Sequence, residues 1–211
     1  MRTLHQLLSQ ADVLVQSYRP AALERLGLSY EQLHEQYPKL VYACGMAFGE
    51  SGPYAHKAGQ DMLAQSLSGI ARTVGDPSLT SHILPVPVVD YASGMSLAQG
   101  VLAALLERQR SGLGQKVTVN LFDTAMALQS LEAASMLMYG AETNWVTQWY
   151  SGAFQTADGA VTCLGLFREN ALRLVCEALR IDDLSQRPEF ATAELQARNK
   201  ERANEIIRPS V

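Results

Sequence analysis

Residues 86–125 constrain the fold more than any other stretch of this chain. They begin with an apolar run that ends at one acidic residue and continue into a long pattern of helical spacing. Prolines bracket Val86, so the run up to Val89 is expected to be extended without being a fully hydrogen-bonded central strand. From Tyr91 to about Arg110 the spacing predicts an amphipathic helix. Its predicted apolar stripe consists of Met95, Ala98, Val101, Leu102, Leu105 and Leu106.

Glycines lie within this helix and directly after it. Gly94 and Gly100 have no side chain and would let another backbone approach closely. Gly112 and Gly114 predict a turn into residues 115–122, where apolar and polar residues alternate as in a half-exposed strand. The stretch therefore predicts the order helix, tight turn and strand.

Two further strands are predicted before this stretch, over residues 11–17 and 40–48, because both are short apolar runs. Strands that alternate with helices predict βα units, a largely parallel sheet and an α/β fold. Ligands of such sheets bind beyond the carboxyl ends of the strands. The residues expected at this ligand edge are Ser17, Tyr18, Arg19 and the loop after Phe48.

The helices between these strands carry recognisable end signals. Pro20 suits the first position of a helix, and Gly27 suits the position that caps its C-terminus. Ser29 and Gln32 have the spacing of a capping box for a second helix, over about residues 30–36.

The remaining pattern predicts helices and one hairpin. Helices are expected over residues 60–71 and, rich in Met and Ala, over residues 123–138. Asp158-Gly159 predicts a hairpin turn, and amphipathic helices are expected over residues 168–179 and 192–207.

The character of the chain changes near Tyr139. We expect part of a large α/β domain over residues 1–139 and a linker over residues 140–150, which are polar and aromatic. Residues 151–211 are then expected to begin a smaller α+β domain that is incomplete.

The composition argues against several classes of function. The 17 Lys and Arg and 21 Asp and Glu form no long block of one charge, so neither nucleic acid nor an anionic membrane is an expected partner. The three cysteines lack zinc spacing and are interpreted as buried thiols, and the four histidines lack metal-ligand spacing, so no metal is expected. The start lacks the apolar core of a signal peptide, and no apolar stretch is judged long enough to span a bilayer. We therefore expect a soluble, cytoplasmic protein.

Two acidic residues stand at the predicted starts of helices. Asp90 occupies an N-cap position, where free N–H groups and the helix dipole favour a carboxylate. One interpretation of Asp90 is capping alone; the other is nucleophilic attack on an acyl group, which the rigid apolar approach favours. Asp61 follows a loop of residues 49–59 and is likewise either a cap or an active-site carboxylate.

Two arginines flank the turn after the first predicted strand. Arg19 and Arg25 lie where a phosphate-bearing ligand would meet helix N-termini. The other interpretation is that both are solvated surface side chains.

Five sequence blocks follow one another in a characteristic order: ADVLVQSYRPAALERLGL, LVYACGMAFGESGPY, GQDMLAQSLSGI, residues 86–125 and QTADGAVTCLG. In this order they resemble the class III CoA transferases, the CaiB/BaiF family that includes formyl-CoA transferase. The resemblance covers nearly the whole chain. It implies a Rossmann-like large domain, CoA and acyl-CoA as substrates, and a small carboxylic acid as acceptor.

The resemblance also implies roles for individual residues. Asp90 falls on the family's nucleophilic aspartate, which is acylated by the donor acyl-CoA and then carries CoA as an aspartyl-CoA thioester. Asp61 falls on an acidic position near the active site, and Arg25 is the expected phosphate contact. Positions that line the family's CoA site fall on Ser17, Tyr18, Arg19, Ala22, Arg25, Leu26, Ala58 and Gln60.

Some positions depart from the family pattern. Ser17 stands where Asn is usual, and Gln60 stands where Tyr is common. Racemases of the superfamily carry His in a GHD motif, whereas this chain has GQD at Gly59-Gln60-Asp61. The missing base favours CoA transfer, with an acyl-CoA racemase or epimerase as the alternative.

Family members extend beyond this chain at both ends and form interlocked ring dimers. The resemblance therefore implies a homodimer, but a chain truncated at both ends would not close such a ring. A third interpretation is accordingly an inactive truncated remnant that folds without acting as an enzyme.

Overall fold

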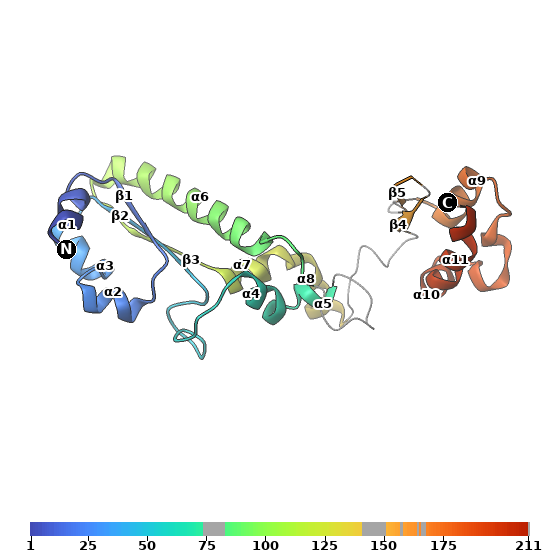
Figure 1. Ribbon diagram of the computed structural model, residues 1–211, viewed down its shortest axis with the longest axis horizontal. Helices are drawn as coiled ribbons and strands as arrows, with labels where there is room; N and C mark the ends of the chain where they lie inside the picture. The colour runs from blue at the N-terminus through green and yellow to red at the C-terminus, as the bar shows by residue number, and fades with distance from the viewer. Residues whose placement is uncertain (74–82, 141–150, 157, 164, 166–167, 211) are drawn as a thin grey trace. The chain divides into compact units, whose positions relative to one another are not determined.

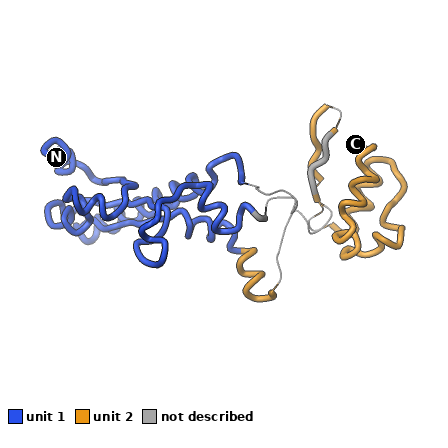
Figure 2. Tube along the Cα trace, turned by 60° about the horizontal axis from the view of Figure 1, so that its bottom comes forward, with its two compact units in different colours: residues 1–130 blue, residues 131–211 orange. Residues whose placement is uncertain are grey.

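The structure, a computed structural model, describes residues 1–73, 83–140, 151–156, 158–163, 165 and 168–210. The chain forms two compact units, residues 1–130 and 131–211 (Figure 2). All but the first residue of the predicted linker, residues 140–150, lies outside the described residues. The division into domains that the sequence suggested therefore stays a prediction.

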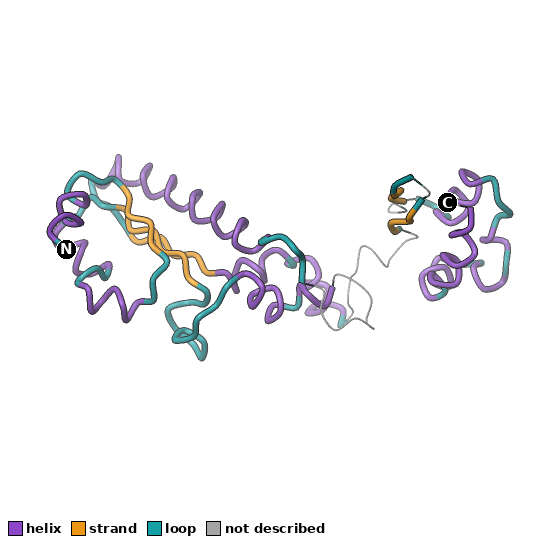
Figure 3. The backbone as a smooth tube through the Cα atoms, viewed as in Figure 1, coloured by secondary structure: helices purple, strands orange, loops and turns teal. Residues whose placement is uncertain are grey.

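Unit 1 is built on a three-stranded parallel sheet (Figure 3). Its strands are β1 (Val13–Gln16), β2 (Val41–Met46) and β3 (Lys116–Asn120), in the order β1-β2-β3. Val13 pairs with Val41 and Tyr42 pairs with Lys116, so β2 lies between the other two strands. The predicted α/β fold with a parallel sheet is confirmed.

Three short helices lie near the start of the chain: α1 (Arg2–Leu8), α2 (Pro20–Leu26) and α3 (Tyr30–Gln36). The predicted end signals are confirmed, because Pro20 is the first residue of α2 and Gly27 caps its C-terminus with a φ of 72°. Ser29 and Gln32 form the predicted capping box. The Gln32 N–H donates to Ser29 Oγ over 3.4 Å, and the Ser29 N–H donates to Gln32 Oε1 over 3.2 Å.

The two faces of β2 pack against different helices. Tyr42 joins Leu33 of α3 in a buried apolar cluster that also includes α1. Gly45 points to the opposite face, since side chains alternate along a strand. A Cβ at Gly45 would lie 3.9 Å from Leu97 of the long helix α6 (Val88–Ser111). Helix α6 therefore runs along the face opposite to α1 and α3 (Figure 1).

Helix α6 begins three residues before its predicted start. The residue that precedes it is Pro87, so Asp90 is the third helical residue and not the N-cap, and the interpretation of Asp90 as a cap alone is wrong. The N–H groups of Val89 and Asp90, which a local cap would satisfy, both donate to the side chain of Asp61. A cap from a distant segment thus supports the earlier start, and the run expected to be extended up to Val89 is helical from Val88.

Helix α6 approaches β3 most closely at a glycine, and only part of its predicted apolar stripe is buried. A Cβ on Gly100 would lie 2.6 Å from Val117 Cγ1, so the helix and β3 approach closely there. Three large residues of the predicted stripe, Met95, Leu102 and Leu106, are 48%, 62% and 65% exposed, whereas Val101 and Leu105 are partly buried. The buried face of α6 therefore coincides only in part with the predicted stripe, because the closest approach to β3 leaves no room for a side chain at Gly100.

One described helix, α6, is long and apolar enough to cross a membrane by length and composition alone. The expectation that no stretch reaches this length is wrong. The apolar window of α6 is 17% buried, and the helix packs along β2 and β3 within unit 1.

Two predicted helices are each interrupted once. The helix expected over residues 60–71 is split by Gly69, which has a φ of 92°, into α4 (Asp61–Ser68) and α5 (Ile70–Thr73). The helix expected over residues 123–138 is split at Gln129 into α7 (Leu121–Leu128) and α8 (Ser130–Tyr139). Helix α4 packs on α6 and α7. Their shared apolar cluster includes Ala64, Val89 and Ala125.

Unit 2 contains the predicted hairpin. Strands β4 (Gly152–Gln155) and β5 (Ala160–Cys163) pair in antiparallel fashion. The Thr156 N–H donates to the Gly159 carbonyl over 2.9 Å and closes the turn. The hairpin that Asp158-Gly159 predicted is therefore confirmed.

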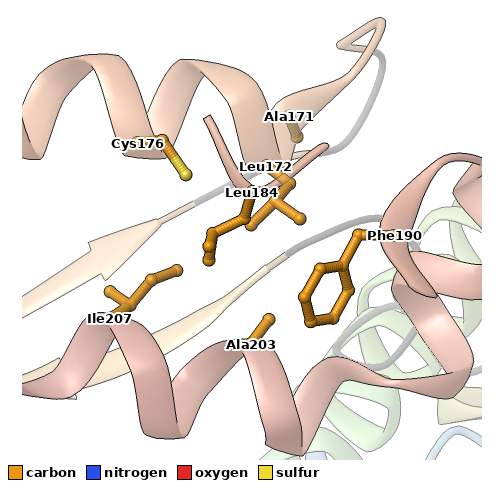
Figure 4. Packing of buried hydrophobic residues seen from close by; sticks show 7 residues of the cluster. All are labelled: Ala171, Leu172, Cys176, Leu184, Phe190, Ala203 and Ile207. Atoms are coloured by element: carbon orange, nitrogen blue, oxygen red, sulfur yellow. The ribbon is translucent and has the colours of Figure 1, made fainter. Parts of the chain in front are cut away.

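Unit 2 also holds a compact helical core (Figure 4). Its elements are α9 (Ala171–Leu179), η1 (Leu184–Gln186), η2 (Pro188–Phe190), α10 (Ala193–Arg198), α11 (Lys200–Ile207) and η3 (Arg208–Ser210). Leu172, Phe190 and Ile207 are all fully buried in it. The helix predicted over residues 192–207 is interrupted at Asn199, which separates α10 from α11.

Candidate active site

The start of α6 lies beyond the carboxyl ends of the strands. Near the other end of α6, Arg108 Nη1 donates to the carbonyls of Asp12 (3.3 Å) and Lys39 (3.0 Å), which lie just before β1 and β2. Asp90 lies about 27 Å along the helix from Arg108, whereas a strand of six residues spans about 20 Å. Asp90 is therefore placed past the carboxyl edge of the sheet, where ligands of parallel sheets bind.

The Asp90 side chain is exposed and forms no hydrogen bond to any described side chain. Partial burial in the first turn of α6 raises the pKa of Asp90, and the negative charge of Asp61 raises it further. A carboxylate that lacks donors and lies near a like charge is less stabilised than one that caps a helix. Asp90 is thus available to react with a ligand.

Asp61 is the first residue of α4, yet it caps α6. Its side chain is 6% exposed. Its Oδ2 accepts hydrogen bonds from the N–H groups of Val89 (2.7 Å) and Asp90 (2.9 Å). The capping that the sequence suggested for Asp61 is therefore directed at another helix. This geometry brings the two predicted acidic residues together.

Gln65 joins this pair and was missed as a site residue by the sequence reasoning. Its Nε2 donates to Asp61 Oδ1, and its Oε1 accepts from the Leu84 N–H over 2.9 Å. Gln65 lies four residues after Asp61, a spacing that places both on one face of a helix. That spacing was the available signal for it.

The predicted CoA-side residues gather at the same edge of the sheet as Asp90. Ser17 and Tyr18 follow β1 directly and are exposed, and Arg19 is the N-cap of α2. Gly59 packs against Ala47 at the end of β2, where a Cβ would lie only 2.6 Å from Ala47 Cβ. This contact brings the neighbouring exposed residues Ala58 and Gln60 to the carboxyl end of β2.

Three further predicted residues lie on α2. Arg25 and Leu26 are exposed, and Ala22 is partly buried. Arg25 Nε donates to the Ala21 carbonyl over 3.2 Å, within its own helix. No other described residue forms a hydrogen bond or ion pair with the Arg25 guanidinium.

A cleft of about 340 Å³ opens between α2, α3 and the sheet. Lys116 forms an ion pair with Glu50 in it, and Gln16 Nε2 lies 2.7 Å from Cys44 Sγ. Burial, followed by the effect of Cys44, raises the pKa of Tyr42 to about 12. None of the predicted site residues lines this cleft. In the described part of the chain, no group of three or more His, Cys, Asp or Glu side chains is arranged to hold a metal.

The profile of one protein family matches almost the entire chain. It is described as CoA-transferase family III and covers residues 1–210. The chain belongs to CoA-transferase family III. The membership that the five sequence blocks suggested is therefore confirmed.

Named relatives and a solved structure of this family resemble the chain over nearly its full length. An acyl-CoA transferase of Fusarium pseudograminearum is 31% identical over 208 residues, which are 96% of this chain and 45% of the relative. A succinyl-CoA:glutarate CoA-transferase of Mus musculus is 29% identical over 213 residues, 98% of this chain and 48% of the relative.

The crystal structure of a CaiB/BaiF family protein from Brucella suis matches with a TM-score of 0.83 and 25% identity. It covers 99% of this chain and 56% of that protein, and it agrees with the predicted Rossmann-like fold. The family III chain thus spans about half the length of the curated relatives it matches.

Proposed function

We propose that this family III polypeptide moves CoA between carboxylic acids and that Asp90 carries the CoA as an aspartyl thioester. The observation that carries this proposal is the Asp90 carboxylate. It is exposed beyond the carboxyl edge of the sheet, lacks a donor among the described side chains, and has a raised pKa because of partial burial and Asp61. A weakly stabilised carboxylate is a better nucleophile than a capped one.

The transfer proceeds in four balanced steps. An Asp90 oxygen bonds to the acyl carbon of the donor thioester, the C–S bond breaks, and a mixed anhydride and CoA thiolate result. The thiolate attacks the Asp90 carboxyl carbon, which releases the donor acid as a carboxylate and leaves the aspartyl-CoA thioester. The acceptor carboxylate attacks this thioester and expels the thiolate. The thiolate then attacks the acceptor acyl carbon and frees the Asp90 carboxylate.

The predicted CoA-side residues are proposed to hold the CoA. Ser17, Tyr18 and Arg19 follow β1, Ala58 and Gln60 lie at the end of β2, and Ala22, Arg25 and Leu26 present the surface of α2. Arg25 is proposed to bind phosphate because a guanidinium matches phosphate oxygens with paired donors. Cytoplasmic location and a homodimer also remain predictions.

Trapping of the acyl intermediate tests the role of Asp90. The chain is incubated with an acyl-CoA and then with hydroxylamine, and the modified residue is located by mass spectrometry. Modification at Asp90 is expected, and it should be absent in Asp90→Ala. Glu107→Ala, an exposed acidic residue near the other end of α6, is the matched control and should be modified like the parent chain. Equal modification of Asp90→Ala and the parent would refute the proposal.

Isotope transfer gives an independent test of the full cycle. In the steps above, one oxygen of the acceptor carboxylate remains on Asp90 after the last step. An acceptor labelled with ¹⁸O should therefore place ¹⁸O in Asp90. Exchange of solvent deuterium into the α-carbon of the acyl group, without ¹⁸O in Asp90, would instead support a racemase.

Calorimetric titration with CoA tests whether this chain, which spans about half the length of its relatives, binds CoA by itself. Binding near 1 μM, about −8 kcal/mol, would show that this half-length chain holds the nucleotide by itself. Failure to bind would favour the inactive remnant.

A further inference from the structure

Gln65 is fully buried, and both ends of its side-chain amide are used. Its Nε2 donates to the Asp61 carboxylate, and its Oε1 accepts from the Leu84 N–H. A flipped amide would place its N–H₂ group against the Leu84 N–H and its oxygen against the carboxylate. Because buried polar groups must be paired to avoid a free-energy cost, the amide has one orientation.

The two side chains link α4 to the segment that leads into α6. Gln65 holds this segment at Leu84, and Asp61 holds it at Val89 and Asp90. The two bonds to Asp61 Oδ2 use N–H groups that have no partner within the helix. One continuous set of hydrogen bonds therefore fixes both ends of residues 84–90.

We propose that Gln65 is a positioning residue that holds Asp61 against the main chain of Asp90 and thereby sets the place and charge environment of the nucleophile. This inference rests on the proposed function, because it concerns the same carboxylate. Gln65 itself bonds to Asp61 and Leu84 and acts through them.

The arrangement has an electrostatic consequence. Asp61 places a negative charge beside Asp90 while Asp90 is a free carboxylate, and like charges at short range disfavour this state. Acylation neutralises Asp90 and removes the repulsion. The network therefore disfavours the free carboxylate relative to the acyl and thioester forms of Asp90. The repulsion is already partly relieved in the transition state of the attack, where the charge of Asp90 is being lost, and this relief accelerates the step.

Gln65→Glu tests the role because only the protonated form of the introduced carboxyl can donate a hydrogen bond to Asp61. The protonated introduced carboxyl can donate to Asp61 and accept from Leu84, as the amide does. The ionised form places an acceptor against the Asp61 carboxylate. Acyl labelling of Asp90 relative to the parent chain should fall by roughly 10- to 100-fold at neutral pH. The ratio should recover as the pH falls through the pKa of the introduced carboxyl, which burial and Asp61 raise above about 4.3.

Gln99→Glu makes the same chemical change at an exposed position of α6 and serves as the matched control. Its labelling ratio should stay near 1 at every pH. A ratio for Gln65→Glu that does not change with pH would overturn the positioning role. If Gln65→Glu does not fold, Gln65→Met replaces it. Parent-level labelling of folded Gln65→Met would equally overturn the role.

Amide hydrogen exchange separates this inference from the proposed function, because it needs no acyl-CoA. Protection factors of Leu84, Val89 and Asp90 should fall at least tenfold in Gln65→Glu at neutral pH and return at low pH. If the parent chain is never labelled but this protection behaves as expected, the proposed function fails and the positioning of Asp90 stands. Unchanged protection in a folded variant would overturn the inference.

Discussion

Asp90 and Asp183 are the same residue type at the start of two helical segments, and their surroundings differ. Asp183 precedes η1 in unit 2, and its carboxylate accepts from the Ser185 hydroxyl (2.7 Å), the Ser185 N–H (3.0 Å) and Gln186 Nε2 (3.1 Å). The Ser185 hydroxyl is the first cause that lowers the pKa of Asp183. Among the residues that the structure describes, Asp90 has no such donors, and its pKa is raised.

The difference shows which carboxylate stabilises the fold and which one is left free to react. Asp183 performs the local capping that the sequence also suggested for Asp90. At α6 this capping is taken over by Asp61, so Asp90 can sit in the first turn of a helix without serving as its cap. Burial and the nearby charge of Asp61 raise the pKa of Asp90 although it lies at a helix start, and such a perturbed carboxylate is typical of functional sites.

The largest effect is expected when the distant cap is removed. Asp61→Ala leaves two N–H groups of α6 and the buried Gln65 amide without their acceptor. We expect a loss of about 2–4 kcal/mol in the free energy of unfolding, measured from urea midpoints at an unchanged m value. Asp12→Ala is the control, since Asp12 is a 75% exposed partner of Arg108 at 2.8 Å. A loss for Asp61→Ala no greater than that for Asp12→Ala would contradict the cap.

The second anchor of α6 is its close contact with β3. Gly100→Ala would bring a Cβ to 2.6 Å from Val117 Cγ1, and we expect a loss of about 1–3 kcal/mol from overpacking. Gly94→Ala is the control, because a Cβ there meets nothing within 4 Å, and a gain of up to about 1 kcal/mol is expected from helix propensity. Val117→Ala should relieve the Gly100→Ala variant. Equal effects of the two glycine substitutions would contradict the close packing.

Much of unit 1 could be predicted from the sequence because its signals are local. Pro20, Gly27 and the Ser29–Gln32 capping box act within a few residues, and each is found where it was predicted. The apolar runs of β1 and β2 and the alternation of β3 likewise needed no knowledge of distant contacts.

The start of α6 and its buried face could not be predicted in this way. Its cap comes from Asp61, which precedes Asp90 by 29 residues, and no pattern around Asp90 reveals it. At its closest approach to β3 this face has room only for Gly100 beside Val117, whereas the amphipathic pattern ranks residues by hydrophobicity. Gln65 was overlooked for a related reason, because a buried amide is recognised only when both of its partners are known.

Asp183 offers the next comparison. Asp183→Ala should lower the free energy of unfolding by less than Asp61→Ala, because the cap it removes lies at the surface of unit 2. The folded-state pKa of Asp183 is lowered, so its stabilising contribution is present above the usual Asp value of 3.8 and is lost as the pH falls through the folded-state pKa. Urea unfolding of Asp183→Ala and the parent from pH 7 downward measures this. Asp182→Ala, at the exposed neighbouring residue, is the control, and it should change the free energy of unfolding by less than Asp183→Ala does. A pH-independent difference for Asp183→Ala would contradict the assignment.

Asp90→Asn should change the free energy of unfolding least, and it should raise this free energy whereas Asp183→Ala lowers it. The folded-state pKa of Asp90 is raised, so its contribution to stability is full below the unfolded value of about 3.8 and is lost as the pH rises through the folded-state pKa. At neutral pH the carboxylate is therefore unfavourable, and its replacement should stabilise the chain by about 0.5 kcal/mol or less, since solvent screens an exposed group. The gain should shrink as the pH approaches 3.8. A loss of stability in Asp90→Asn at neutral pH would mean that Asp90 stabilises the fold as Asp183 does, and the contrast between the two carboxylates would fail.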